Sequence, residues 1–299
     1  MRIPLELAET LAAIVDEGSL DAAALRLRVT PSAVSQRLKT LEEMLGRVVL
    51  VRSKPARATV AGEAVVRLAR QMALLQHDAL EQIGVATDDA GARVSIPLAV
   101  NADSLATWFL PPLARLSVAL PVVFELHRDD QDFTAALLES GTAMGAVTSR
   151  ATPVAGCRVS ALGAMRYEAV ATPAFMATWL PGGATADALA TAPVVDFDRR
   201  DDLQTRWLQE RRADPARPPR HYVPASSDFA HAVRAGLGWA LLPRFQSQDA
   251  LEDGSLVPIG GQPIDVPLYW QQWNLRSTLL DAVAAEIIAE GRRVLAPLG

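Results

Sequence analysis

The sequence has 299 residues, which is enough for two or three domains that each bury a core. Half of the residues are hydrophobic and 21% are charged, a composition that excludes an intrinsically disordered chain. The single cysteine, Cys157, excludes an intrachain disulfide, and no CxxC metal-binding spacing occurs. No run of eighteen apolar residues occurs, and the first ten residues lack the apolar core of a signal peptide. We therefore expect a cytoplasmic protein with no membrane partner.

The N-terminal segment predicts three helices. The first covers residues 3–15 and ends at Gly18. The second, about residues 20–27, carries three consecutive alanines that allow a neighbouring helix to approach closely. Thr30 followed by Pro31 is typical of an N-cap and a first helical position, so the third helix is predicted from residue 31 to about residue 45. The last two helices, joined by a tight turn, are typical of a helix-turn-helix motif.

The third predicted helix has two chemically different faces. Apolar side chains at helical spacing are predicted to pack inward, namely Ala33, Val34, Leu38, Leu41 and Leu45. The opposite face suits DNA, because Gln and Arg can hydrogen-bond to base edges while Ser and Lys can reach phosphates. The candidate DNA-binding residues here are Thr30, Ser32, Ser35, Gln36, Arg37 and Lys39. The alternative is the solvent-exposed face of an ordinary helical hairpin.

A short apolar run after Gly46 is followed by three cations, Arg52, Lys54 and Arg57. This pattern predicts a β-hairpin wing whose cations contact the phosphate backbone. Between residues 26 and 57 the chain has eight Lys or Arg against two Glu, so this segment carries +6 in a chain of net charge −5. Binding to DNA is therefore expected to be confined to this part of the surface.

The order of these elements resembles the N-terminal domain of LysR-type transcriptional regulators over about sixty residues. The resemblance is carried by the alanine-rich helix, the stretch TPSAVSQRLKTLEEMLG, the RSKP wing and the helix start TVAG at 59–62. It implies an all-α winged helix-turn-helix domain, expected at residues 3–59, with a double-stranded DNA operator as its partner. If the protein is an activator, RNA polymerase is a second partner.

A long helix is predicted from Thr59 to about Gly84, and residues 60–90 are expected to form a linker helix and hinge. Its apolar residues are spaced alternately by four and three positions, which is a heptad seam made of Ala61, Val65, Leu68, Met72, Leu75 and Ala79. The seam predicts a homodimer that presents two DNA-binding domains to two half-sites. The alternative is a helix packed on its own domain. The family resemblance implies homotetramers.

Residues 91–299 alternate predicted strands and helices, which is typical of an α/β fold with mostly parallel sheets. The pattern resembles the two-lobed, periplasmic-binding-protein-like effector domain of the same family, with lobe I at about 91–164 and 266–299 and lobe II at about 165–265. The predicted strands are 94–100, 122–127, 144–148, 158–163, 167–171, 192–196, 239–242 and 268–273. The predicted helices are 103–118, 130–140, 173–179, 201–211, 228–235 and 277–295.

Ligands of α/β sheets bind beyond the carboxyl ends of the strands. The helix expected to begin at Asp103 offers free N–H groups to a carboxylate, with the Ser104 hydroxyl beside them. Acidic and hydroxyl side chains also follow several other predicted strands, and the acidic ones suit cationic groups of a ligand. The alternative for each of these residues is an ordinary N-cap. The candidate effector-binding residues are Asn101, Asp103, Ser104, Leu105, Asp130, Thr148, Phe197, Asp198, Ser226, Ser227 and Asp228.

Stretches across the whole chain resemble the ArgP/LysG branch of LysR-type regulators: NADSLATWFLP, GAVTSRATPVAGC, VVDFDRRDD, SSDFA and LYWQQW. The resemblance implies a regulator of basic-amino-acid export or metabolism that senses lysine or arginine and needs no cofactor. The stretch HRDDQDFT departs from the more acidic pattern of that branch at Arg128 and Gln131. A different small carboxylate effector is therefore the alternative.

Two other classes of function are weighed against this one. An enzyme is disfavoured because no GxSxG motif occurs, the four histidines have no partner motif, and the GLG at 236–238 lacks the rest of a dinucleotide fingerprint. A cytoplasmic ligand-binding protein without DNA contact is disfavoured by the +6 segment. We expect no enzymatic activity.

Overall fold

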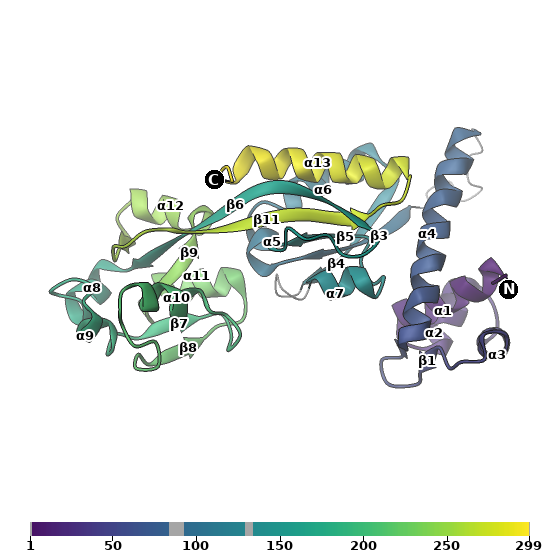
Figure 1. The fold of residues 1–299 in the computed structure, drawn as a ribbon, viewed down its shortest axis with the longest axis horizontal. Coiled ribbons are helices and arrows are strands. Elements are labelled where there is room, and N and C mark those ends of the chain that lie inside the picture. Colours follow the sequence, from purple (N-terminus) through teal and green to yellow (C-terminus); the bar gives the residue numbers. More distant parts are fainter. Residues whose placement is uncertain (1, 84–92, 129–133, 299) are drawn as a thin grey trace.

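A computed structural model describes residues 2–83, 93–128 and 134–298. A small helical domain lies at one end, the long helix α4 stands beside it, and a two-lobed α/β domain forms the rest (Figure 1). No helix in the described ranges is long and apolar enough to cross a membrane. The elements of the N-terminal domain are α1 (Leu5–Glu17), α2 (Leu20–Leu27), α3 (Pro31–Leu45), β1 (Leu50–Val51) and β2 (Arg57–Ala58).

The local signals read from the N-terminal sequence are confirmed. Gly18 ends α1 with a left-handed φ of 70°, and the Thr30 hydroxyl accepts a hydrogen bond from the Ala33 amide at 3.2 Å. The inward face of α3 is buried at Val34, Leu38 and Leu41, whereas Ala33 and Leu45 are only half-buried. These residues pack with α1 in a core that is separate from the core of the α/β domain.

Helix α4 (Val60–Gln82) begins at Thr59, whose hydroxyl accepts a hydrogen bond from the Gly62 amide at 3.1 Å. A Cβ at position 62 would collide with the carbonyl oxygen of Val49, so only glycine lets the first turn of α4 lie against the wing. The N-terminal half of α4 contributes Val65, Val66 and Ala69 to the N-terminal core. The helix start is thereby fixed to the DNA-binding domain.

The C-terminal half of α4 packs against the α/β domain. Leu74 belongs to the core of that domain. The buried Asp78 accepts hydrogen bonds from the amides of Thr278 and Leu279, at 3.1 and 3.4 Å, where α13 (Thr278–Val294) begins. Arg70 donates to the carbonyls of Gly141 and Thr142 and also pairs with Asp16 of α1. One helix therefore contacts both domains.

The main sheet of the α/β domain has seven strands in the order β10-β6-β11-β5-β3-β4, and β9 also pairs with β6. Among the described strands of this sheet, β3 pairs parallel with β4 and β5 and every other pairing is antiparallel, so the expectation of a mostly parallel sheet is wrong. The physical reason is that β11 returns from the far lobe and inserts antiparallel between β5 and β6. The strands are β3 (Val94–Val100), β4 (Val122–Arg128), β5 (Gly145–Thr148), β6 (Cys157–Ala171), β9 (Ala240–Pro243), β10 (Val257–Pro258) and β11 (Ile264–Trp273).

Strand β6 is continuous from Cys157 to Ala171, although the sequence predicted two strands. The pairing of β6 with β11 shifts register between Leu268 and Tyr269, which leaves Leu162 as an extra residue beside Gly163. This bulge explains the false break in the sequence pattern. Strands β6 and β11 run together from one lobe to the other, and the lobe limits expected at residues 164 and 266 fall inside them (Figure 1).

The helix expected at 103–118 is two helices, α5 (Ala102–Thr107) and α6 (Leu110–Ala119). The break occurs because the amides of Trp108 and Phe109 both bond to the Ser104 carbonyl, while Pro111, which has no N–H, lies in the first turn of the next helix. Helix α7 (Thr134–Glu139) is the described part of the helix expected at 130–140.

The second lobe contains the two-stranded parallel sheet β7-β8 beside β9 and β10. The sequence did not predict α9, β8, α12 or β10, which are all short. The elements are α8 (Pro173–Trp179), α9 (Ala186–Leu189), β7 (Val194–Asp196), α10 (Leu203–Glu210), β8 (Arg220–Tyr222), α11 (Ser226–Arg234) and α12 (Arg244–Glu252).

Candidate functional site

The polar face of α3 is exposed along most of its length. Thr30, Ser32, Ser35, Gln36 and Lys39 all reach solvent. Arg37 differs, because its guanidinium forms an ion pair with Glu6 of α1 and its side chain is only partly exposed. Gln36 is therefore the long side chain of this face that reaches solvent without a carboxylate partner, whereas Lys39 lies 3.6 Å from Glu43.

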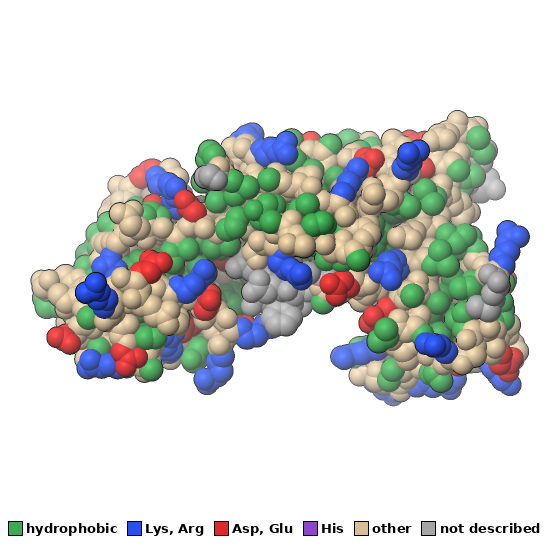
Figure 2. Space-filling model, viewed as in Figure 1, with side chains coloured by type: hydrophobic (Ala, Val, Ile, Leu, Met, Phe, Trp, Pro, Cys, Tyr) green, Lys and Arg blue, Asp and Glu red, His purple; other side chains and the backbone are tan. Residues whose placement is uncertain are grey.

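The wing adds three exposed cations to this surface. Arg52, Lys54 and Arg57 lie on or between β1 and β2, and none of them forms an ion pair with another residue of the described ranges. Figure 2 shows basic side chains along the lower edge of the N-terminal domain, where α3 and the wing lie in Figure 1. A surface with unpaired cations beside hydrogen-bonding side chains suits the backbone and base edges of DNA.

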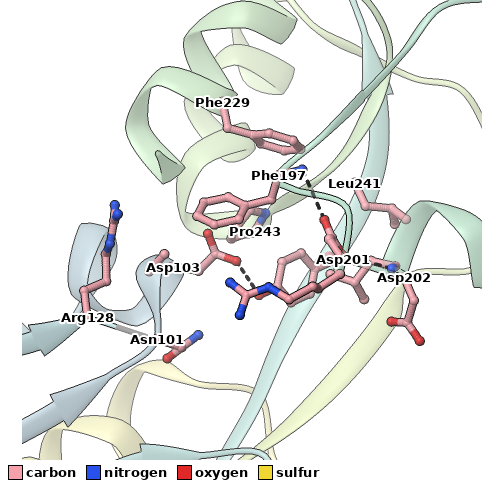
Figure 3. A pocket seen from close by; sticks show the side chains of 13 residues that line it. Asn101, Asp103, Arg128, Phe197, Asp201, Asp202, Phe229, Leu241 and Pro243 are labelled. Carbon is pink, nitrogen blue, oxygen red and sulfur yellow. Dashed lines mark hydrogen bonds between the residues drawn. The ribbon is translucent and has the colours of Figure 1, made fainter. Parts of the chain in front are cut away.

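A cavity of about 170 Å³ lies between the two lobes of the α/β domain (Figure 3). Its walls come from the start of α5, the end of β4, strands β6 and β9, the loop before α10, and α11. It is lined by Asn101, Ala102, Asp103, Arg128, Tyr167, Phe197, Arg200, Asp201, Asp202, Leu203, Phe229, Leu241 and Pro243.

Asp103 projects from α5 into this cavity. Its Oδ2 accepts a hydrogen bond from the Tyr167 hydroxyl at 2.6 Å, and its Oδ1 accepts one from the Ser226 hydroxyl at 2.7 Å. Burial raises the pKa of Asp103, and the two hydroxyl donors oppose that rise only in part. No residue in the described part of the chain forms an ion pair with this carboxylate.

Asp201 faces the same cavity from the loop before α10. Burial raises its pKa to about 6, and the negative charges of Asp196 and Asp103 act in the same direction. The amides of Leu203 and Phe197 donate to the carboxylate at 3.0 and 3.4 Å, which lowers the pKa without cancelling the rise. Asp201 also has no ion-pair partner in the ranges that the structure describes.

The structure brings some of the sequence-predicted effector residues together and leaves others apart. Asn101, Asp103 and Phe197 line the cavity, and Ser226 supports Asp103. The Asn101 Oδ1 and Ser104 Oγ atoms are buried and have no hydrogen-bond partner among the described residues. The residues that do not line the cavity are Ser104, Leu105, Thr148, Asp198, Ser227 and Asp228. Asp130 lies outside the described residues.

The carboxylate of Asp198 is bonded to groups of its own turn. It accepts hydrogen bonds from the amides of Arg200 and Asp201, at 2.6 and 3.1 Å, and forms an ion pair with the Arg200 guanidinium at 3.0 Å. Burial alone would raise the pKa of Asp198, but these donors lower it below its ordinary value. Ser227 and Asp228 are exposed on α11.

Sequence reasoning did not identify most of the lining. The missed residues with functional groups are Tyr167, Arg200, Asp201 and Asp202, while Arg128 was noted only as a departure from a family pattern. Asp201 and Asp202 stood at the start of the helix predicted at 201–211, where an acid is an ordinary cap. Tyr167 lies in a predicted strand, and the residues around it give no signal that its hydroxyl bonds to an aspartate 64 positions away.

Two family models match the chain. Residues 5–63 match the bacterial regulatory helix-turn-helix protein, lysR family, and residues 90–291 match the LysR substrate binding domain. The lysine export transcriptional regulatory protein LysG of Corynebacterium glutamicum is 42% identical over 297 residues, which cover 97% of this chain and 99% of that relative.

Two solved structures extend the comparison to three dimensions. The crystal structure of ArgP from Mycobacterium tuberculosis has a TM-score of 0.85 at 43% identity, and full-length LysG from C. glutamicum with bound effector Arg has 0.76 at 38%. Each alignment covers 99% of this chain and 100% of the other. The chain therefore belongs to the LysR family of bacterial transcriptional regulators, with a helix-turn-helix DNA-binding domain and a two-lobed effector domain.

Proposed function

We propose that this regulator responds to an amino acid with a cationic side chain, arginine or lysine, and controls the export or metabolism of basic amino acids. One observation carries the proposal. Asp103 and Asp201 face one cavity from different lobes, burial raises the pKa of both, and neither has a cationic partner in the described ranges. A cationic ligand group would supply the missing partner and favour the ionised form of each carboxylate.

The remaining charges of the cavity fit the other end of such a ligand. Arg128 lies on the opposite side of Asp103 from Asp201 (Figure 3), and it forms no ion pair within the described ranges. Guanidinium groups bind carboxylates in a bidentate geometry. Arg128 would therefore receive the α-carboxylate, while Asp103 and Asp201 receive the α-ammonium and side-chain cations. The effector bound in C. glutamicum LysG, Arg, carries these same groups.

Calorimetric titration of the full chain tests this assignment. Arginine and lysine should bind, whereas leucine, which has the α-ammonium and α-carboxylate but no side-chain cation, should bind at least tenfold more weakly. Citrulline is a sharper control, since it has nearly the shape of arginine without its charge. Binding of citrulline or leucine as tight as that of arginine would contradict the proposal and favour a regulator of another small carboxylate.

On the N-terminal surface, we infer that different residues contact the bases and the phosphates of DNA. Gln36 contacts base edges, since it is exposed on α3 and has no carboxylate partner. Lys39, Arg52, Lys54 and Arg57 contact phosphates together with the hydroxyls of Thr30, Ser32 and Ser35. Arg37 was expected to read bases, and it can do so only after leaving Glu6.

The two faces of α4 support a homodimer that forms through this helix. Arg70 and Leu74 face the α/β domain of the same chain, and helical spacing sets Leu68, Met72 and Leu75 on the opposite side. Leu75 is 42% exposed, and Leu68 and Met72 are half-buried. This side pairs with the α4 of a second copy and forms the dimer that two half-sites require. Tetramers, and contact with RNA polymerase during activation, follow from the family resemblance.

A further inference from the structure

The Asp103 carboxylate is held by a chain of polar side chains. Each of its oxygens accepts one hydroxyl hydrogen bond, from Tyr167 at 2.6 Å and from Ser226 at 2.7 Å. The Ser226 oxygen in turn accepts a hydrogen bond from the Gln246 side-chain amide of α12 at 3.0 Å. Since that amide donates to the Ser226 oxygen, the Ser226 proton is directed toward Asp103.

The donors and the acceptor come from different parts of the fold. Asp103 lies in the first turn of the first lobe's α5, Ser226 begins the second lobe's α11, and Tyr167 lies on β6, which connects the lobes. Tyr167 and Ser226 are both buried, at 2% and 5% exposure. The two donors converge on Asp103 only while the lobes are together, so lobe arrangement and the state of this carboxylate are linked.

Among the residues that the structure describes, no cation forms an ion pair with Asp103. Asp201 faces the cavity from the loop before α10, and its negative charge acts against that of Asp103, while Asp202 pairs with Arg206 at 3.2 Å. Of the facing cations, Arg200 pairs with Asp198, and Arg128 lies at the end of β4 without an ion pair to Asp103. Removing a hydroxyl donor would therefore favour protonation of Asp103, because the donors are what opposes its burial.

An ionised acceptor is what a cationic ligand needs. A guanidinium or ammonium group only donates hydrogen bonds, and a protonated carboxyl has lost the charge that attracts it. We propose that Tyr167 and Ser226 are positioning residues, which hold the Asp103 carboxylate ionised and oriented as the acceptor for a cationic group of the effector. This inference rests on the proposed function.

The test measures arginine affinity by calorimetry between pH 5.5 and 8.5 for the wild type, Tyr167→Phe and Ser226→Ala. Each variant should bind arginine about tenfold more weakly at pH 7.5. The pH below which binding is lost should also move upward, because Asp103 protonates more easily. Ser226→Thr, which keeps a hydroxyl, should restore most of the affinity and the wild-type pH profile.

Matched controls separate this role from a general loss of structure. Ser227→Ala changes the exposed neighbour of Ser226 on α11, and Tyr222→Phe changes an exposed tyrosine of the second lobe. Both should bind like the wild type at every pH. A uniform loss of affinity in Tyr167→Phe and Ser226→Ala, with an unmoved pH profile, would overturn the positioning role. Wild-type affinity and profile in both would overturn it as well.

The two outcomes distinguish a failure of the proposed function from a failure of the positioning role alone. If the wild type does not distinguish arginine from citrulline, both the proposed function and this inference are overturned. If the wild type selects arginine but the two hydroxyl variants behave like the wild type, only the positioning role is lost.

Discussion

The DNA-facing surface and the effector cavity are built in different ways from the same chain. The candidate DNA-binding residues all lie between Thr30 and Arg57, on one helix and one wing, and most are set by helical spacing alone. The cavity gathers residues from Asn101 to Pro243 through six elements and the loops between them. The first surface depends on local structure, while the second exists only when distant segments meet. Substitutions should therefore affect the two regions independently.

The largest expected effect comes from the face of α4 opposite the α/β domain. Charges introduced by the double substitution Leu68→Asp and Leu75→Asp would be buried without partners in a paired helix seam. The variant should lose the dimer, and operator affinity should fall by roughly 10²- to 10⁴-fold because the second half-site no longer contributes. Light scattering and a gel-shift assay measure the two effects.

The control for that variant adds a single negative charge elsewhere on the helix. Val60→Asp changes a residue that is 85% exposed and lies outside the seam. It should leave the dimer intact. A dimer that persists in the double variant would show that α4 does not form the dimer interface.

The separation of the two cores can be tested with one buried leucine. Leu38 is 1% exposed in the N-terminal core, so Leu38→Ala should cost about 2 to 5 kcal/mol of that domain's stability. Operator binding should weaken while arginine binding remains, as measured by calorimetry. Leu98→Ala, in the core of the α/β domain, should affect arginine binding first. Equal loss of both activities in each variant would mean that the domains unfold together.

The charge of Asp201 should govern arginine binding. Asp201→Asn should weaken it about tenfold or more, since a hydrogen bond to a charged group contributes roughly 1.5 to 3 kcal/mol. In the wild type the pKa of Asp201 is about 6, so affinity should fall as the pH drops below 6, and the variant should lose this part of the pH dependence. Asp228→Asn is the matched control, because Asp228 is exposed on α11 and does not line the cavity. An equal effect of both variants would contradict the assignment.

The raised pKa of Asp201 also predicts that the Asp201→Asn variant is more stable than the wild type at neutral pH. A folded-state pKa above the ordinary value means that ionised Asp201 destabilises the fold, and this cost is present above pH 6 and disappears as the pH falls toward 4. Without added arginine, Asp201→Asn should therefore raise the Tm at pH 7.5 but not at pH 4. A lower Tm at pH 7.5 would mean that the amide hydrogen bonds of this carboxylate outweigh its desolvation.

Substitutions of base-contacting and phosphate-contacting residues should have different effects on DNA binding. Gln36→Ala should cost roughly 1 to 3 kcal/mol on the operator and relax sequence preference. Lys54→Ala should weaken binding to all sequences alike and reduce the salt dependence, because it removes a phosphate contact. Affinities on operator and scrambled DNA at several salt concentrations measure this. The same loss of specificity from both substitutions would contradict the division.

The smallest expected effect concerns the ion pair between Arg37 and Glu6. Glu6→Gln removes the partner that holds Arg37, so DNA affinity should rise by less than about 1 kcal/mol, the usual scale of an exposed ion pair. Glu43→Gln, beside Lys39, serves as a comparison on the same helix. A decrease in affinity with Glu6→Gln would mean that the pair orients Arg37 toward the operator.

The sequence predicted the fold best where neighbouring residues determine it. Thr30 and Pro31 located the start of α3, and Thr59 that of α4, because a cap acts within one turn. The β6 bulge was missed since Gly163 resembles a strand end until β11 pairs with it. In the loop before α10, Asp198 and Asp201 are three positions apart and chemically identical, but Asp201 lines the cavity and Asp198 does not. The turn between them, which directs two amides to Asp198, distinguishes the two, and a residue-by-residue reading of the sequence does not show it.

The ladder between β6 and β11 also constrains how the lobes can move. It is paired from Cys157 with Trp273 to Tyr167 with Ile264, so no flexible linker separates the lobes at this crossing. Relative motion must bend or twist a hydrogen-bonded ribbon, and the bulge at Leu162 and Gly163, where Ala296 also pairs with Ala164, is its irregular point. Lobe motion is thus an elastic deformation of this ribbon, and residues outside the cavity determine how stiff the ribbon is. Substitutions at the bulge would consequently alter how much effector is needed for a response without altering which effector is recognised.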